Sequence, residues 1–160
     1  MASGQQPKKD SGKIIVQDVQ LEEIVDMQDD VDAPPPHFTS KFKTLQDWLQ
    51  NMCDNDKPKQ PIQKYKFGLF ESTDDYTLYL AGVNTSSKGN YRSIRIAFKP
   101  TNMYFKFPKN YFENLTRQQL LDKLTSDLKD FANTEKFKNS FFTKADIVVL
   151  ETNGQTIWSK

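Results

Sequence analysis

The sequence predicts an α+β fold: a mainly antiparallel sheet of about five to six strands, with one long and one short helix packed on it, preceded by a flexible acidic tail. Short runs in which apolar and polar residues alternate lie between residues 65 and 107 and are typical of strands joined by turns. Apolar residues at helical spacing follow residues 41 and 116. The chain also contains 12 Phe, 6 Tyr and 2 Trp residues, which favour the half-buried surface of a sheet.

With 160 residues, the chain has room for one ordinary domain and a tail. We assign residues 38–160 to a single α+β domain and residues 1–37 to a flexible N-terminal tail or linker. Residues 1–13 are small and polar, a composition that does not offset the entropy lost on ordering. Residues 14–32 alternate aliphatic with acidic side chains, and residues 14–25 are the piece expected to be ordered. Two alternatives stay open: the acidic segment is a solvated linker, or it pairs with the domain or with a partner.

The first helix is expected over residues 41–53. Phe42, Leu45, Trp48, Leu49 and Met52 fall on one face of a 3.6-residue repeat. Prolines at positions 58 and 61 prevent the helix from continuing.

The second helix carries the strongest local signal. Thr116 and Gln119 have the spacing of a capping box, in which each side chain accepts a hydrogen bond from the other residue's backbone N–H. Leu115 and Leu120 have the spacing of a hydrophobic staple, and Asn133 is expected to end the helix. A short helical turn over residues 134–142 should add two more aromatic rings to the same core. The apolar side chains expected to face that core are Leu120, Leu121, Leu124, Leu128, Phe131, Phe137 and Phe141.

Four strands are expected over residues 65–69, 76–83, 91–98 and 103–107, with a loop over residues 84–90. In the third strand, Ile94, Ile96 and Phe98 should share one face and Arg95 should lie on the other. The dipeptide Asn153-Gly154 predicts a hairpin between two further strands, because both residues tolerate positive φ.

Residues with catalytic chemistry are few and poorly placed. The single histidine, His37, lies in the tail, where nothing would hold an imidazole rigidly. The single cysteine, Cys53, is followed by Asp54, whose charge raises the pKa of a thiol and opposes its reactivity. The acidic pair Asp74 and Asp75 fits a turn. The acidic tail lacks the spacing of a calcium loop, and no glycine-rich loop joins a strand to a helix. We therefore assign no catalytic, cofactor-binding or metal-binding residue.

Charge is separated along the chain. Residues 14–56 carry ten acidic side chains against two basic ones, whereas residues 57–110 carry ten basic side chains against three acidic ones. Clustered charge of one sign steers association and selects the sign of the partner. Either the acidic segment lies across the basic sheet of its own molecule, or the basic surface meets a protein partner that is acidic at the contact. The partner-binding candidates are basic and aromatic residues of the strands: Arg92, Arg95, Lys66, Lys106, Tyr79 and Tyr104.

These observations favour a non-catalytic protein-binding module, such as a stoichiometric inhibitor or an immunity-type protein that neutralises a bacterial toxin or effector. One alternative is a periplasmic or lipid-anchored accessory domain, and another is an enzyme with an unrecognised carboxylate or Tyr/Lys site. A third is a nucleic-acid-binding module that uses the basic aromatic sheet, although a net charge of +1 disfavours it. No apolar run is long enough to span a bilayer. A cytoplasmic location and a periplasmic lipoprotein whose signal has been removed both stay open.

Overall fold

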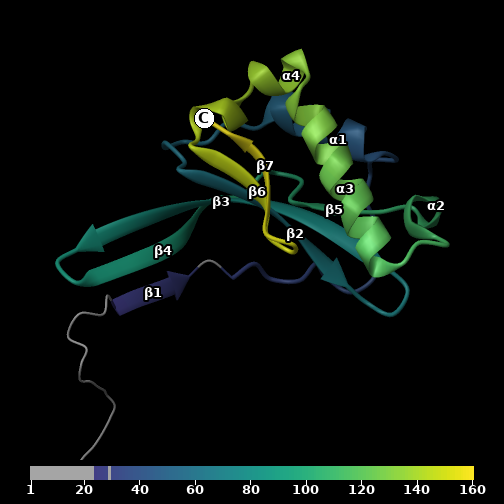
Figure 1. Ribbon diagram of the computed structural model, residues 1–160, viewed down its shortest axis with the longest axis horizontal. Helices are drawn as coiled ribbons and strands as arrows, with labels where there is room; N and C mark the ends of the chain where they lie inside the picture. The colour runs from purple at the N-terminus through teal and green to yellow at the C-terminus, as the bar shows by residue number, and fades with distance from the viewer. Residues whose placement is uncertain (1–23, 29) are drawn as a thin grey trace, which may run out of the picture.

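Helices cover one side of a twisted sheet, and residues 30–38 run along the other side (Figure 1). The computed structural model describes residues 24–28 and 30–160. The α+β class and the mainly antiparallel sheet are confirmed. The helices are α1 (Leu45–Asn55), α2 (Lys109–Phe112), α3 (Arg117–Ala132) and α4 (Glu135–Lys138), with a 3₁₀ turn η3 (Phe141–Lys144). The strands are β1 (Ile24–Gln28), β2 (Lys64–Glu71), β3 (Tyr76–Lys88), β4 (Tyr91–Phe98), β5 (Tyr104–Lys106), β6 (Ile147–Leu150) and β7 (Gln155–Ser159).

The described sheet has seven strands, where five to six were expected. Its main path runs β1-β4-β3-β2-β6-β7, and β5 pairs with β3. Neighbours along the path are antiparallel except for the parallel pairs β1–β4 and β2–β6. The added strand is β1, whose residues pair from Ile24 opposite Tyr91 to Gln28 opposite Arg95.

The predicted loop over residues 84–90 is wrong, because β3 continues to Lys88 while β4 pairs beside it. The turn is confined to Gly89 and Asn90, and Gly89 adopts a φ of 63°, which glycine reaches without strain. The two strands project beyond the helical layer as an arm, called here the β3–β4 arm (residues 84–95; Figure 1).

The prediction that Ile94, Ile96 and Phe98 share one face of the sheet is also wrong. The register shifts by one residue where Val83 pairs with Ile96 and Gly82 pairs with Phe98. Because one extra residue reverses the alternation of side chains, Phe98 turns toward the helices. There its ring packs against Tyr65 and Phe141, with centroid distances of 6.1 and 5.5 Å.

Helix α3 begins as predicted. The Thr116 hydroxyl accepts a hydrogen bond from the Gln119 N–H (3.1 Å), and the Gln119 side chain accepts one from the Thr116 N–H (2.9 Å). Asn133 is the C-cap. Leu115, by contrast, is 37% exposed, so the outer half of the predicted staple stays at the surface. The predicted stripe is buried: Leu120, Leu121, Leu124, Leu128 and Phe131.

Helix α1 begins four residues later than expected. The Thr44 hydroxyl accepts a hydrogen bond from the Asp47 N–H (3.0 Å), which makes Thr44 the N-cap and leaves Phe42 outside the helix. Phe42 is partly buried and still packs against the core, although it lies outside the helix.

The core between helices and sheet is rich in aromatic rings, as the composition indicated. Trp48 is fully buried, and its indole N–H donates a hydrogen bond to the Asn102 carbonyl (2.7 Å), so the polar end of the ring is satisfied. The largest fully buried side chains also include Tyr65, Phe67, Phe105, Phe137 and Phe142.

The C-terminal hairpin forms where Asn153-Gly154 predicted it. Its turn covers residues 151–154, and only Gly154 has a positive φ, at 71°. Asn153 acts through its side chain, which accepts a hydrogen bond from the Gln155 N–H (3.2 Å) and donates one to the Thr125 hydroxyl of α3 (3.0 Å). The hairpin is therefore anchored to the longest helix.

Residues 1–37 were assigned to a flexible tail, but the C-terminal part of this range contains a β-strand. Residues 24–28 form β1, and residues 30–37 continue toward the domain. The rest of the piece expected to be ordered, residues 14–23, lies outside the described residues, as do residues 1–13.

Replacing Leu124 with Ala should lower the free energy of unfolding by about 2–5 kcal/mol, because its fully buried side chain would leave a cavity. Chemical denaturation measures this change. Leu115→Ala is the matched control, since the partly exposed Leu115 should lose less than about 1 kcal/mol. Equal losses for the two variants would contradict the assigned face of α3.

Replacing Thr116 with Ala should cost about 1 kcal/mol through loss of the helix cap, whereas Thr116→Ser, which keeps the hydroxyl, should cost much less. Thermal unfolding of the two variants gives the comparison. A loss of the same size in both would show that the methyl group matters and the cap does not.

Candidate protein-binding face

The side of the sheet opposite the helices carries a cluster of basic and aromatic residues. Direct strand pairs place them on one side, because Phe70 lies opposite Thr77, Thr77 opposite Lys106, and Tyr79 opposite Tyr104. Lys66 shares this side, two strand positions from Gly68, which lies opposite Tyr79. We call this surface the helix-free face and define it by Lys66, Phe70, Thr77, Tyr79, Tyr104 and Lys106.

The aromatic rings of the helix-free face form a continuous row. Phe70 lies 5.3 Å from Tyr79 and 6.4 Å from Tyr104, measured between ring centroids. The Tyr79 ring lies across Gly68, where an added Cβ would come within 2.3 Å of the Tyr79 ring and hydroxyl. Glycine at position 68 therefore lets the tyrosine ring lie flat against the backbone of β2.

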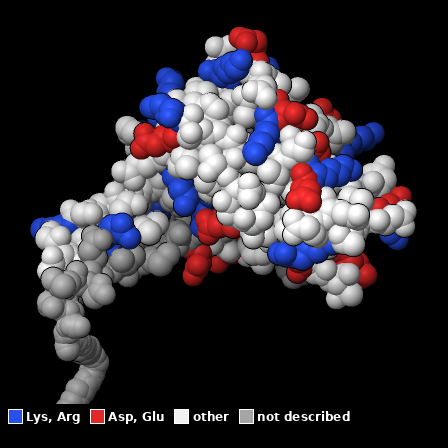
Figure 2. Space-filling model, viewed as in Figure 1, with Lys and Arg blue, Asp and Glu red and all other residues white. Residues whose placement is uncertain are grey.

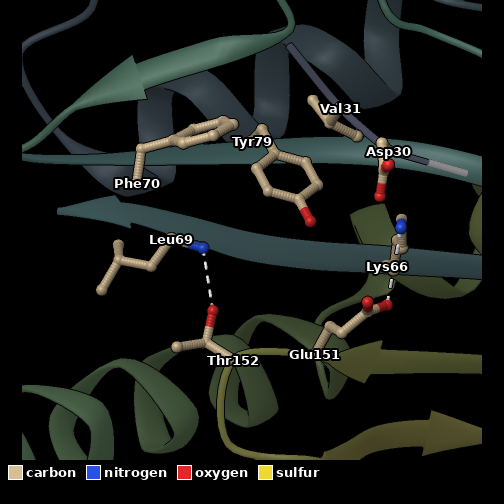
Figure 3. Close-up of a pocket in the computed structure, with 8 residues that line it drawn as sticks. All are labelled: Asp30, Val31, Lys66, Leu69, Phe70, Tyr79, Glu151 and Thr152. Carbon is tan, nitrogen blue, oxygen red and sulfur yellow. Dashed lines mark hydrogen bonds and ion pairs between the residues drawn. The ribbon is translucent and has the colours of Figure 1, made fainter. Parts of the chain in front are cut away.

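Lys66 is a cation held almost out of water. Its side chain is 4% exposed and its ammonium group lies 3.6 Å from the Glu151 carboxylate. The Asp30 carboxylate also points toward that ammonium (Figure 3). Because a buried charge is costly unless it is compensated, the two carboxylates allow a lysine at this position. These residues, with Val31, Leu69, Phe70, Tyr79 and Thr152, line a cavity of about 350 Å³.

The chain's own residues 30–38 lie along the helix-free face, and we call them the covering segment. The Tyr104 hydroxyl donates a hydrogen bond to the Asp32 carbonyl. The Lys106 ammonium donates to the Phe38 carbonyl (3.4 Å) and pairs with Asp75 (3.3 Å). The Phe38 ring meets the Tyr104 ring edge-on at 5.8 Å. Burial, and then the charge of Asp32, raise the pKa of Tyr104, so the hydroxyl stays protonated and able to donate.

A tight turn directs the covering segment back to α1. The Phe38 N–H donates to the Pro35 carbonyl (3.1 Å), and His37 at the third turn position has a φ of 61°. Proline followed by a residue of positive φ is the pattern of a type II turn. The His37 side chain is exposed at this turn. Pro35 and Pro36 therefore form part of a defined turn.

The six predicted candidates divide into two groups. Lys66, Lys106, Tyr79 and Tyr104 come together on the helix-free face, whereas Arg92 and Arg95 lie on the β3–β4 arm beside β1. Basic side chains mark that arm, while both signs of charge alternate over the helical layer (Figure 2).

The two arginines point to opposite sides of the sheet. Arg95 is exposed, as expected, and lies on the side away from Lys66. Arg92 is half-buried, and its Nε has no hydrogen-bond partner among the described residues. The six candidates therefore do not form one continuous surface, because strand alternation sends residues three positions apart to opposite sides of the sheet.

The Cys53 thiol is held in its protonated form. Burial raises the pKa of the Cys53 thiol to about 11, with a smaller contribution from Asp54 that a hydrogen bond to Ser140 opposes. Within residues 24–28 and 30–160, no three metal-ligating side chains gather. None of the helices in this part of the chain is long and apolar enough to cross a membrane.

Comparisons with protein-family models, with curated proteins and with solved structures found no match for this chain.

Replacing Gly68 with Ala should displace the Tyr79 ring and cost about 1–3 kcal/mol of stability, as overpacking does. The same substitution in a Tyr79→Ala background should cost distinctly less, because the ring that it strikes is gone. Urea denaturation of the parent, the two single variants and the double variant gives the four stabilities that this double-mutant cycle compares. Additive losses would contradict the contact between Gly68 and Tyr79.

Proposed function

We propose that the protein is a non-catalytic protein-binding module whose helix-free face recognises an extended, acidic segment of a protein partner. The observation that carries the proposal is the seating of the covering segment, which is an extended acidic peptide bound to this face. These intramolecular contacts support the binding of a partner segment of the same chemistry.

The recognition uses groups suited to a peptide. Tyr104 and Lys106 donate to backbone carbonyls, a contact available from any extended chain, while Phe38 supplies an aromatic anchor. Acidic side chains of a bound peptide would lie near the basic residues of the helix-free face. The Asp30 carboxylate of the covering segment, which points toward Lys66, has this arrangement within the chain (Figure 3). A partner would bind by displacing the covering segment, so the segment acts as an internal competitor.

A stoichiometric inhibitor, including an immunity-type protein that neutralises a bacterial toxin, is the specific form of binding module that we propose. Such a protein needs a surface that blocks its target and no reacting group of its own. Arg95 on the arm would act at longer range, by attracting an acidic partner before contact.

The test uses a fluorescent peptide with the sequence of residues 30–40, added to the full-length protein. The double variant Asp30→Asn/Phe38→Ala weakens the internal competitor and leaves the face intact. We expect this variant to bind the peptide about fivefold or more tightly than the parent. In the same background, Tyr104→Phe and Lys106→Gln should each weaken binding by about threefold to tenfold. Fluorescence anisotropy measures these affinities.

Lys109→Gln is the matched control, because Lys109 is an exposed lysine outside the face, and it should leave the affinity unchanged. Arg95→Glu should slow association at low salt, with a loss that shrinks as salt is added. Equal peptide affinity for the parent and the double variant, together with insensitivity to Tyr104→Phe, would refute the proposal. If single-stranded oligothymidylate bound more tightly than the peptide, with the same dependence on Tyr104 and Lys106, the face would instead be assigned to nucleic-acid binding.

A further inference from the structure

A large cavity lies on the helical side of the sheet and is separate from the helix-free face. It has a volume of about 830 Å³ and opens between the C-terminal end of α1, the loop over residues 56–63 and η3. Pockets that hold small ligands have volumes of roughly 300–1,000 Å³, with apolar linings and a few polar groups. The size of this cavity falls in that range.

Apolar side chains line the interior of the cavity. Ile62 is 5% exposed and Tyr65 is 1% exposed, and the Phe141 ring packs against Tyr65 at 5.2 Å. The Tyr65 hydroxyl has no hydrogen-bond partner among the described residues, although its side chain is buried. Burial raises the pKa of Tyr65, which keeps this hydroxyl protonated. Because this hydroxyl belongs to a residue that lines the cavity and bonds to no described residue, it can donate a hydrogen bond to a ligand acceptor there.

The charged residues around the cavity leave an excess of positive charge. Asp54 is paired with Lys136 (2.7 Å), and the Asp56 carboxylate accepts hydrogen bonds from the Thr101 N–H and hydroxyl (2.9 Å each). The lysines of the rim differ, because they are exposed and form no ion pair with any described residue. They are Lys57, Lys59 and Lys144.

We infer that this cavity binds a small organic anion with an apolar body, of the class of aromatic or medium-chain carboxylates. The apolar body would pack against Ile62, Tyr65 and Phe141. The carboxylate would lie among the rim lysines, with the Tyr65 hydroxyl as a donor to one of its oxygens. This inference does not depend on the proposed function, because β2 directs Tyr65 to the opposite side of the sheet from Lys66.

The probe is 2-naphthoate, with uncharged 2-naphthalenemethanol as its analogue, titrated calorimetrically into the full-length protein. We expect naphthoate to bind with a dissociation constant below about 1 mM, and at least about fivefold more tightly than the alcohol. Tyr65→Phe keeps the ring and should weaken naphthoate binding by about fivefold. The triple variant Lys57→Gln/Lys59→Gln/Lys144→Gln should weaken it by about tenfold.

The matched control is Lys43→Gln/Lys109→Gln/Lys129→Gln, which removes the same charge from exposed lysines outside the cavity and should leave binding unchanged. Cys53 lines the cavity and is the single cysteine, so bound naphthoate should also slow its alkylation by iodoacetamide. Equal binding of acid and alcohol, or equal weakening by both triple variants, would overturn the inference. The inference would also be overturned if naphthoate left the rate of Cys53 alkylation unchanged while a protein partner slowed it. That outcome would show that the cavity is a contact surface for a protein.

Discussion

The packing of Phe142 joins the helical layer to the sheet, and much of the molecule depends on it. The ring is fully buried and lies 5.2 Å from Tyr65 and 6.0 Å from Phe67 of β2, and 5.1 Å from Phe137 of α4. Because Phe142 belongs to η3, this cluster also places Phe141 over Tyr65 and brings the chain to the start of β6. Strand β6, which pairs in parallel with β2, therefore begins directly after this cluster, and Tyr65 and Phe141 of the cluster also line the large cavity.

The two sides of the sheet satisfy different physical requirements. The helical side buries apolar and aromatic area, which is favourable without directional partners. The helix-free face instead carries cations and hydroxyls, which need partners when water is removed. Glu151, Asp30 and the carbonyls of the covering segment surround or contact these groups. The covering segment therefore has an electrostatic and hydrogen-bonding role that apolar packing alone would not explain.

Strand β2 links the two candidate sites. Tyr65 and Lys66 are neighbours in sequence, yet alternation sends one into the cavity on the helical side and the other to the helix-free face. The strand is held on both edges, by β3 and β6, so neither side chain shifts without disturbing the sheet. The cavity and the helix-free face, which differ in chemistry, are therefore both built on strand β2.

The sequence by itself determined the features that depend on short-range contacts. The capping box of Thr116, the leucine stripe of α3 and the hairpin at Gly154 each act within a few residues, so spacing alone predicted them. The separation of charge also gave contact between the acidic segment and the basic sheet as one of two alternatives. Only the tertiary structure decided the extension of β3, the bulge that turns Phe98, the parallel pairing of β1 and the path of the covering segment. These features depend on hydrogen bonds and ring contacts between residues far apart in the chain, such as Tyr104 with Asp32, and no local pattern encodes such a pair.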